Sequence, residues 1–287
     1  MPSAPVGLVA KSFSGLWGDC IPPFFLGGGF LASYLFRALR GRLGLSLIGS
    51  TVRYKRAFRA AHPEYFDPDG ILVFCGAQGQ GKTLSAVSYL YRLCLCYPEV
   101  CVCTNVCLVD AADCTFCYGL HDNSLEDARV QRWLAARAGF ANPICCVAYD
   151  SVDRLTDVNN GYAGVLYLID EMHLEFNSLE SKQMNSNIFY QVSQQRKQRK
   201  HIVGTSQVFT RLAKPFREQF KYLVQCRCFF GVLQCNRLVD ALDCTEDSDG
   251  HVVVGKSKPF FWLHDPKIYA MYDTLQTITR TRKEWKI

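Results

Sequence analysis

An eight-residue glycine-rich segment, G-A-Q-G-Q-G-K-T at residues 76–83, limits what this chain can fold into. It follows the uncharged apolar run I-L-V-F-C at residues 71–75. It precedes a stretch whose apolar residues recur with helical spacing. A strand, a glycine-rich loop and a helix in this order form a P-loop, whose backbone N–H groups surround phosphate oxygens. The segment therefore predicts an α/β fold that binds a nucleotide.

The residue types in this segment fit a nucleoside triphosphate, and the predicted cofactors are ATP and Mg²⁺. Glycines let the backbone fold closely around phosphates, and the amino end of a helix adds partial positive charge. We expect Lys82 to reach the β- and γ-phosphates and Thr83 to offer its hydroxyl to Mg²⁺. The predicted nucleotide-binding residues of the loop are Gly76, Ala77, Gln78, Gly79, Gln80, Gly81, Lys82 and Thr83.

A second apolar run, V-L-Y-L-I at residues 165–169, ends in the acidic pair Asp170-Glu171. An apolar strand that ends in an acid is the Walker B pattern, in which the carboxylate helps to hold Mg²⁺. Asp170 is therefore the predicted Mg²⁺ ligand together with Thr83. Hydrolases of the ASCE branch of P-loop proteins place a catalytic glutamate directly after it, so Glu171 is the predicted general base for the attacking water.

A third strand pattern, at residues 202–205, ends at Ser206-Gln207. In ASCE proteins the strand after Walker B ends in a polar residue that contacts the γ-phosphate or the attacking water. Gln207 is the predicted residue of this kind, and Ser206 is the second choice, as a nucleotide contact. A polar strand end that caps the following helix is the alternative interpretation.

The basic run R-K-Q-R-K-H at residues 196–201 leaves two functional interpretations open. Arg196 and Arg199 are predicted catalytic residues if the run supplies an arginine finger to a neighbouring subunit's ATP. The same arginines would otherwise contact DNA phosphates. A solvated helix end is the structural alternative, since cations near a helix carboxyl terminus are favourable. His173 is left as either a supporting group or a side chain without such a role.

The order of these patterns predicts a fold of the P-loop NTPase class (ASCE, RecA-like). We expect a mostly parallel central sheet, helices on both faces, and a C-terminal β-rich extension. The predicted domains are an apolar and basic arm (1–60), the P-loop ATPase domain (61–232) and a basic β-rich extension packed on it (233–287). Predicted helices cover 83–96, 124–138 and 181–197, and predicted strands cover 71–75, 99–106, 144–148, 165–169, 202–205, 222–232 and 237–241.

Residues 21–48 and the cysteines each leave an alternative open. The uncharged run 21–36 is shorter than the ~20 residues of a spanning helix, and it contains two prolines and three consecutive glycines. It is either a membrane-seeking segment or a glycine-rich arm that packs on the core or a neighbouring subunit. The 15 irregularly spaced cysteines indicate buried thiols in a reducing compartment. Cys114 and Cys117 have half of a zinc-site spacing, so a structural zinc stays an alternative.

Several of these elements together resemble a known family. The segments G-A-Q-G-Q-G-K-T, L-I-D-E-M-H and R-K-Q-R-K-H-I-V-G-T-S-Q, with the trailing R-L-A-K-P-F-R-E-Q, are similar to the Zot-like ATPases of phages. That group includes the filamentous-phage assembly ATPase and belongs to the FtsK/HerA branch of P-loop motors. The resemblance covers about residues 70–232. By this resemblance Lys82 and Thr83 bind nucleotide, Asp170 and Glu171 serve Mg²⁺ and water, and Gln207 senses the γ-phosphate.

The resemblance implies a phage ATP hydrolase that couples ATP hydrolysis to DNA translocation or genome packaging during virion assembly. The implied partners are further copies in a homo-oligomeric ring, DNA, and other virion or assembly proteins. A net charge of +6 permits a polyanionic partner. The alternative is a Zot-like, membrane-associated factor for phage assembly or secretion. The expected location is the host cytoplasm, with inner-membrane association under the alternative. Filamentous-phage relatives carry a transmembrane helix after the ATPase domain, and its absence here favours packaging.

Overall fold

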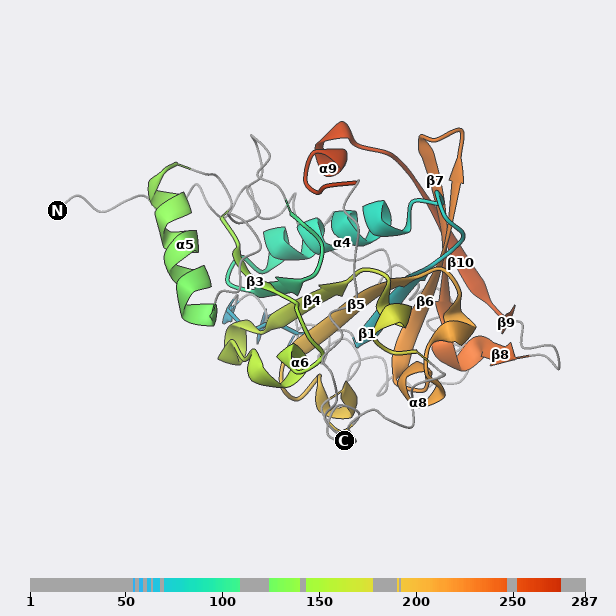
Figure 1. Cartoon of the computed structure of the whole chain (residues 1–287), viewed down its shortest axis with the longest axis horizontal. Coiled ribbons are helices and arrows are strands. Elements are labelled where there is room, and N and C mark those ends of the chain that lie inside the picture. Colours follow the sequence, from blue (N-terminus) through green and yellow to red (C-terminus); the bar gives the residue numbers. More distant parts are fainter. Residues whose placement is uncertain are drawn as a thin grey trace, which may run out of the picture. The chain divides into compact units, whose positions relative to one another are not determined.

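The computed structural model describes residues 54, 57–58, 61–62, 64–67, 70–108, 124–139, 143–177, 190, 192–246 and 252–274. The chain divides into two compact units, Met1–Pro63 and Glu64–Ile287. In the first unit the rings of Tyr54, Phe58 and His62 follow one another at four-residue intervals, with centroids 6.3 Å and 4.6 Å apart. The sheet and the helices packed on it belong to the second unit (Figure 1).

The central sheet has eight strands in the order β10-β7-β6-β1-β5-β4-β2-β3. Its strands are β1 (Ile71–Cys75), β2 (Cys101–Thr104), β3 (Cys145–Ala148), β4 (Val165–Ile169), β5 (Lys200–Ser206), β6 (Phe220–Phe229), β7 (Leu233–Asp240) and β10 (Ser257–Leu263). Strands β1 to β6 run parallel to one another, whereas β7 pairs antiparallel with both β6 and β10. A separate antiparallel pair is formed by β8 (Cys244–Glu246) and β9 (Val252–Val254). The prediction of a mostly parallel sheet is confirmed.

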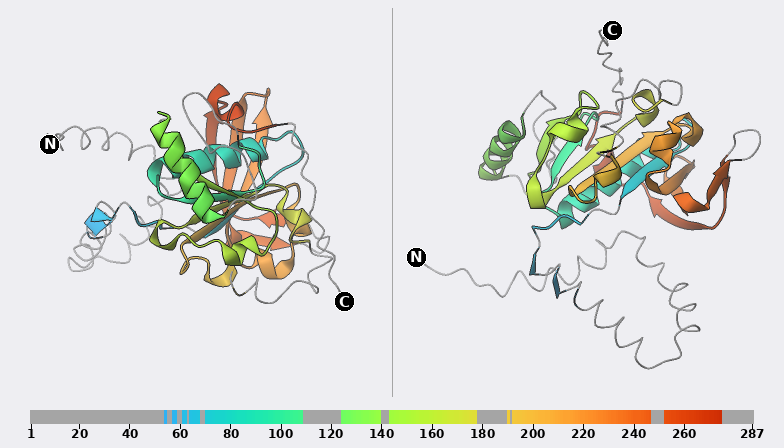
Figure 2. Two further views of the ribbon diagram at one scale, coloured as in Figure 1. Left: turned by 60° about the vertical axis from the view of Figure 1, so that its left-hand side comes forward. Right: turned by 90° about the horizontal axis from the view of Figure 1, so that it is seen from below.

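Helices lie on both faces of the sheet, as predicted. The helices are α4 (Lys82–Cys96), α5 (Leu125–Arg137), α6 (Arg154–Asp157), α8 (Lys214–Arg217) and α9 (Pro266–Tyr269), with short 3₁₀ turns η2 (Gly161–Ala163), η3 (Met172–Leu174), η5 (Phe209–Arg211) and η6 (Ala241–Asp243). Figure 1 shows α4 along one face and α6 and α8 on the other. In the view from below in Figure 2, the strands of the main sheet follow one another side by side, with α5 beyond the β3 edge.

The core lies in two layers, one on each face of the sheet. Both β1 and β4 are buried along their whole length, as expected of strands covered on two faces. Alternate residues such as Tyr167 join Leu155 of α6 and Phe216 of α8 in one cluster. On the opposite face α4 buries its apolar side, including Val87 and Leu90. Each such side chain stabilises the fold by roughly 1.5–3 kcal/mol, so this packing fixes the strand ends that carry the polar residues.

The helix predicted over 124–138 forms as α5 and begins with a capping box. The backbone N–H of Asp127 donates to Ser124 Oγ at 3.2 Å, and the N–H of Ser124 donates to Asp127 Oδ2 at 3.3 Å. This reciprocal pair satisfies two N–H groups that would otherwise lack partners at the helix start. The local sequence was therefore sufficient to place this helix.

The C-terminal strands differ from the predicted arrangement. The boundary at 232/233 falls in the turn between β6 and β7, and both β7 and β10 belong to the main sheet. This part of the chain is thus continuous with the sheet and is not a layer packed on it. The predicted strand over 99–106 is shorter, at Cys101–Thr104. Of the predicted helix over 181–197, residues 195–197 form turns.

Some predictions lie outside the described residues, among them Cys114, Cys117 and the apolar segment 21–48. The cysteines that the structure describes are in the thiol form, outside any disulfide, and Cys145 and Cys146 are buried in β3. Within the described ranges, no helix is long and apolar enough to cross a membrane. No group of three or more His, Cys, Asp or Glu side chains that could hold a metal ion occurs among those residues either.

Candidate functional site

The glycine-rich loop between β1 and α4 has a backbone that glycine adopts readily. Gly79 and Gly81 have φ values of +75° and +71°, in the left-handed region. Gly76 has no room for a side chain, because a Cβ there would lie 2.8 Å from the carbonyl oxygen of Cys226. Gly81 is also the N-cap of α4, so the loop leads directly into a helix amino terminus. Backbone N–H groups in such a setting favour phosphate.

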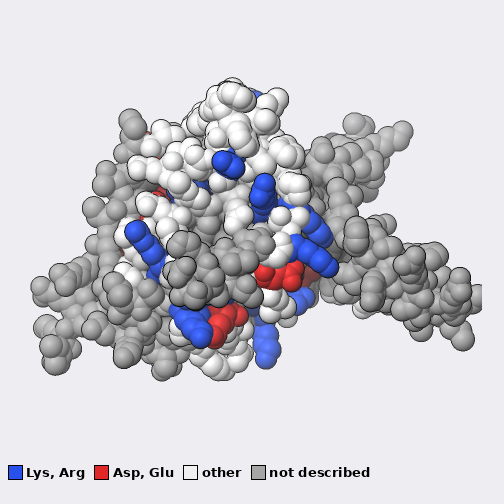
Figure 3. Space-filling view, turned by 90° about the vertical axis from the view of Figure 1, so that its right-hand side faces the viewer, with Lys and Arg blue, Asp and Glu red and all other residues white. Residues whose placement is uncertain are grey.

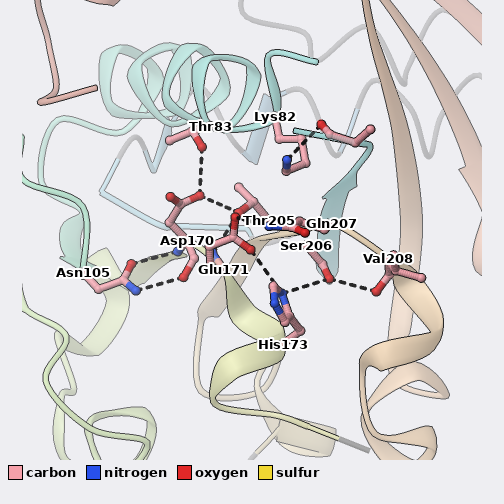
Figure 4. A network of polar contacts seen from close by, with 11 residues as sticks. Lys82, Thr83, Asn105, Asp170, Glu171, His173, Thr205, Ser206, Gln207 and Val208 are labelled. Atoms are coloured by element: carbon pink, nitrogen blue, oxygen red, sulfur yellow. Dashed lines mark hydrogen bonds and ion pairs between the residues drawn. The ribbon is translucent and has the colours of Figure 1, made fainter. Parts of the chain in front are cut away.

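Lys82 is the first residue of α4, and only 7% of it is exposed. Its ammonium group donates a hydrogen bond of 3.1 Å to the carbonyl oxygen of Ala77 (Figure 4). The ammonium therefore reaches back across the loop, between the two flanks of the glycine-rich turn. Ala77, Gln78 and Gly79 are exposed, so the loop opens to solvent at this point.

Asp170 follows β4 and lies opposite the start of α4, as the Walker B pattern predicts. Its Oδ1 accepts hydrogen bonds from the hydroxyls of Thr83, at 3.0 Å, and of Thr205 in β5. Its backbone is held by Asn105, which accepts from the Asp170 N–H at 2.8 Å and donates to the Asp170 carbonyl at 3.0 Å. The two predicted Mg²⁺ ligands are thus in direct contact (Figure 4).

The surroundings of the Asp170 carboxyl fit a cation. Burial raises the pKa of Asp170, and the hydrogen bonds from Thr205 and Thr83 only partly oppose this effect. A buried carboxylate without a positive partner is unfavourable, so a divalent cation would compensate it. Carboxylate and hydroxyl oxygens suit Mg²⁺, which usually keeps several waters and takes few protein ligands. The residues present therefore fit the predicted ion.

Glu171 has a left-handed backbone, with φ of 50°, where the chain turns from β4 into η3. Its N–H donates to Thr205 Oγ1 at 3.0 Å, which fixes this turn against β5. One carboxylate oxygen lies 3.5 Å from Gln207 Nε2, and the other lies 3.2 Å from His173 Nδ1. Non-glycine residues with positive φ cluster at functional sites. Gln207 thus contacts one carboxylate oxygen, whereas Oε2, beside His173, is buried without a hydrogen-bond partner among the described residues.

The predicted third-strand residues are placed differently from each other. Gln207 follows the end of β5 and is exposed beside Glu171. Ser206 is fully buried, and its hydroxyl donates to the carbonyl of Val208 at 3.0 Å and lies 3.5 Å from His173 Nδ1. Burial lowers the pKa of His173 below its usual value, although Glu171 opposes the shift. His173 thus links Ser206 to Glu171.

Arg196 and Arg199 lie at the amino ends of the parallel strands, whereas the glycine-rich loop follows the carboxyl end of β1. Both residues precede Lys200, the first residue of β5. Arg196 is exposed. The guanidinium of Arg199 donates to the carbonyl of Phe66 at 2.7 Å and lies 4.6 Å from the ring centroid of Tyr65. Within one chain, neither arginine is brought together with the other predicted catalytic residues.

The last two residues of the basic run are buried, so the alternative of a solvated helix end does not hold for them. Lys200 and His201 open β5 and are 4% and 2% exposed. Lys200 Nζ donates to the carbonyl of Leu155 at 2.7 Å, and burial lowers its pKa. The two ring nitrogens of His201 lie 2.5 Å from the carbonyl oxygen of Gly70 and 3.1 Å from the hydroxyl of Tyr89. Pairing of β5 between β1 and β4 overrides the polar composition.

Two residues of the site, Asn105 and Thr205, were missed by the sequence analysis. Asn105 follows the apolar strand β2, and Thr205 is next to last in β5. A usable signal existed for Asn105, because carboxyl ends of neighbouring parallel strands meet at one edge of the sheet. Gln80 was predicted as a nucleotide contact, but its side-chain oxygen accepts from the N–H of Cys228 in β6 at 2.9 Å. The side chain of Gln80 thus ties the glycine-rich loop to β6.

Comparison with known proteins gives similarity to solved structures alone. No family model and no curated protein sequence matches this chain. The genome packaging NTPase B204 from Sulfolobus turreted icosahedral virus 2, in complex with ATPγS, is 14% identical, with a TM-score of 0.43 over 66% of this chain and 98% of that chain. The N-terminal domain of zonular occludens toxin from Neisseria meningitidis is 15% identical, with a TM-score of 0.44 over 71% and 98%.

The flagellar accessory protein FlaH from Methanocaldococcus jannaschii is 10% identical, with a TM-score of 0.35 over 60% of this chain and 77% of that chain. These scores are too low to transfer a function. The strand order, the glycine-rich loop and the contacts around Asp170 are observations on the chain itself, and they give it the α/β fold of a P-loop NTPase.

Proposed function

We propose that this protein binds and hydrolyses ATP at the site formed by the glycine-rich loop and the ends of β4 and β5. One observation carries the proposal: the hydroxyl of Thr83 and the carboxylate of Asp170 are 3.0 Å apart, with Glu171 and Gln207 beside them. A nucleotide-binding loop alone requires none of the three residues at the strand ends. Their convergence supports hydrolysis in addition to binding.

The loop would hold the triphosphate, with the N–H groups after Gly79 directed at its oxygens. Lys82, which now donates to Ala77, would donate to the β- and γ-phosphates. Thr83 and Asp170 would hold Mg²⁺, which when bound neutralises charge on the phosphate oxygens. These residues would place the γ-phosphate next to the carboxylate of Glu171.

Glu171 would accept a proton from the attacking water as general base. Its left-handed backbone and the hydrogen bond from its N–H to Thr205 fix the turn that carries the carboxylate (Figure 4). Gln207 Nε2 lies 3.5 Å from one carboxylate oxygen, and His173 Nδ1 lies 3.2 Å from the other, which has no hydrogen-bond partner in the described part of the chain. Gln207 would in addition contact the γ-phosphate, and its release from Glu171 would then report the state of the nucleotide.

We further propose that hydrolysis drives movement of DNA, as in FtsK/HerA-type motors, during packaging of a phage genome. The motif resemblance supports this function, and so does one face of β6, β7 and β10. Residues two apart on a strand share a face, and by strand register Arg227, Arg237, Phe229 and Phe261 lie on the same side and are exposed. The guanidinium of Arg227 lies 5.5 Å from the ring centroid of Phe229.

Residues 225–229, 233–237 and 259–263 contain no Asp or Glu. In the view toward the β10 edge, Figure 3 shows Lys and Arg side chains at several places, some among uncharged residues and some beside Asp and Glu side chains. Arginines with exposed aromatic rings suit a nucleic-acid backbone and its bases. DNA is therefore the proposed track, and a homo-oligomeric ring in the host cytoplasm is the proposed assembly.

Arg196 and Arg199 would act across a subunit boundary if they act in catalysis. Their place at the amino ends of the strands suits contact with a second copy better than contact with their own nucleotide. Arg196, which is exposed, is the better candidate for a finger, since Arg199 is already held by Phe66. A membrane-associated assembly factor is the second candidate function, and the apolar run at residues 21–36 favours it.

The test is ATP turnover of the purified full chain, measured alone, with single-stranded DNA and with double-stranded DNA. We expect DNA to raise turnover, and we expect Lys82→Ala to reduce turnover to background while the protein stays folded. Arg227→Ala with Arg237→Ala should weaken the DNA stimulation and leave basal turnover intact. If Lys82→Ala hydrolyses ATP at the parental rate, the proposal is wrong. If turnover does not respond to DNA and the full chain sediments with membranes, the second candidate function replaces the first.

A further inference from the structure

Two amides lie buried inside β7, behind the glycine-rich loop. Gln234 and Asn236 are 0% and 1% exposed. They share the face of the antiparallel strands that is turned toward α4, where apolar side chains would pack without difficulty. Buried polar side chains reduce stability unless their hydrogen bonds are satisfied. The hydrogen-bond partners of these two amides therefore indicate their role.

The partner of Gln234 is the backbone of the loop. Its Nε2 donates to the carbonyl oxygen of Gln80 at 3.0 Å and to Asn236 Oδ1 at 2.8 Å. Its Oε1 lies 3.0 Å from His264 Nε2. A Cβ placed on Gly81 would collide with the same Oε1. Gln234 thus touches the loop at two consecutive residues, directly before Lys82.

Neighbouring contacts tie the same strands to the loop and its helix. The N–H of Cys228 in β6 donates to Gln80 Oε1 at 2.9 Å, and Asn236 Nδ2 donates to Ser85 Oγ of α4 at 3.1 Å. The β6–β7 ladder is closed by backbone pairing and does not need these side chains. The polar layer therefore serves the loop rather than the hairpin.

We propose that Gln234 is a positioning residue, which holds the backbone at Gln80 and Gly81 in the conformation that receives the phosphates. The inference rests on the proposed ATP site and adds a residue that does not contact the nucleotide. Gly81 has a left-handed backbone and is the N-cap of α4. A change in its φ and ψ would therefore change the direction of the N–H groups at the helix start. A donor fixed in the sheet keeps the Gln80 carbonyl from turning.

Loss of this donor would leave the half-buried Gln80 carbonyl without the hydrogen bond from Gln234, and the loop would spend less time in the receptive form. Apparent affinity falls in proportion to the fraction of molecules in that form. A lost buried hydrogen bond corresponds to about a tenfold change in such an equilibrium. Gln234 should therefore act on ATP affinity, whereas Glu171 should act on the rate of the chemical step.

The test compares Gln234→Met with a matched control, Asn160→Leu, in the full chain. Asn160 is also a buried amide, which donates to the carbonyls of Glu99 and Gly164 and accepts from Arg129, but it lies away from the loop. We expect Gln234→Met to raise the KM for ATP, and the Kd for a non-hydrolysable ATP analogue, about tenfold, with kcat within about twofold. Asn160→Leu should lower the melting temperature without changing either constant.

The inference is overturned if Gln234→Met binds the analogue as tightly as the parental protein, or if Asn160→Leu weakens binding equally. Should Gln234→Met fail to fold, a cycle of Gly81→Ala and Gln234→Ala gives the same answer. The loss of affinity caused by Gly81→Ala should be smaller in the Gln234→Ala background, because the collision partner is gone. If the losses of affinity in the two single variants add up in the double variant, Gln234 and Gly81 do not act through a common contact. If the parental protein binds the analogue but does not hydrolyse ATP, only the proposed hydrolysis is wrong. The affinity for the analogue still tests the role of Gln234.

Discussion

The parallel and antiparallel halves of the sheet place polar residues differently. In the parallel half, made of β1, β5, β4, β2 and β3, the functional side chains stand just beyond strand ends, as Asn105, Asp170 and Gln207 do. The antiparallel half is made of β7, β10 and β6, which pairs parallel with β1 on its other side. Here Gln234 and Asn236 stand inside β7 and point at α4. Strand ends offer open space for a ligand, whereas strand interiors offer fixed positions. Chemistry is therefore expected from the first half and support from the second.

Each half also holds a non-glycine residue in the left-handed region. Glu171, with φ of 50°, is fixed by contacts of its N–H and of both carboxylate oxygens. Phe230, with φ of 54°, is 93% exposed in the turn between β6 and β7 and precedes Gly231 at +71°. The same backbone strain is thus supported by a network in one half and by almost no packing in the other.

The largest expected effect in the parallel half is that of Glu171→Gln. Loss of the general base should lower kcat about 10³-fold, while the Kd for ATP changes little because the loop is intact. Single-turnover hydrolysis and equilibrium binding of a fluorescent ATP analogue measure the two quantities separately. Gln234→Met is the matched counterpart, with affinity reduced and kcat kept. The distinction between the halves is lost if Glu171→Gln weakens binding as much as turnover.

This contrast also explains how much could be predicted from the sequence. The strands β1 and β4 were readable because an uninterrupted apolar run led into residues of known chemistry, Lys82 and Asp170. The capping box at Ser124 was readable because it is local. Gln234 was not, because its partner Gln80 lies 154 positions away and only strand pairing brings them together. The burial of His201 was missed because the residues around it in the sequence are polar, and only the pairing of β5 with β1 and β4 shows that it is buried.

The next effect concerns Thr205, which joins Asp170 to Glu171. Thr205→Val keeps the shape but removes the hydroxyl that donates to Asp170 and accepts from the Glu171 N–H. The half-buried N–H of Glu171 would lose its partner, which should lower the unfolding free energy by about 1–2 kcal/mol. We expect kcat to fall about tenfold as the turn loosens. Urea unfolding and steady-state turnover report the two losses.

Thr104→Val serves as the control for that variant. Thr104 is equally buried at the end of β2, and its hydroxyl accepts from the N–H of Val106 at 3.0 Å without contacting Asp170 or Glu171. It should lose comparable stability and keep its turnover. Equal turnover in both variants would mean that Thr205 is structural only, and that the strand ends are less specialised than the comparison claims.

A change of opposite sign is expected in the antiparallel half at Phe230. Asn tolerates the left-handed region better, and Asn-Gly is the preferred pair for a two-residue hairpin turn with positive φ at both positions. Phe230→Asn should therefore raise the unfolding free energy by about 1 kcal/mol, since the exposed ring contributes little packing. Thermal melting of the two proteins checks this, and Phe230→Ala, which keeps the strain, should show no gain. A loss of stability on Phe230→Asn would mean that the ring packs against the fold after all.

The smallest effect is expected at the far edge of the parallel half, where Glu99 pairs with Arg132 of α5. The two hydrogen bonds, at 2.6 Å and 2.7 Å, lower the pKa of Glu99, but more than half of the Glu99 side chain is exposed. Glu99→Gln should lower the free energy of unfolding by at most about 0.5 kcal/mol at pH 7.

This contribution should depend on pH. A carboxyl whose pKa is lowered on folding stabilises the folded state above the ordinary glutamate pKa of about 4.3, and the contribution is lost as the pH falls through the folded pKa. The difference between Glu99→Gln and the parental protein in urea unfolding should therefore disappear below that range. If the two proteins still differ in unfolding free energy at pH 3, the Glu99 side chain acts through packing and not through its charge.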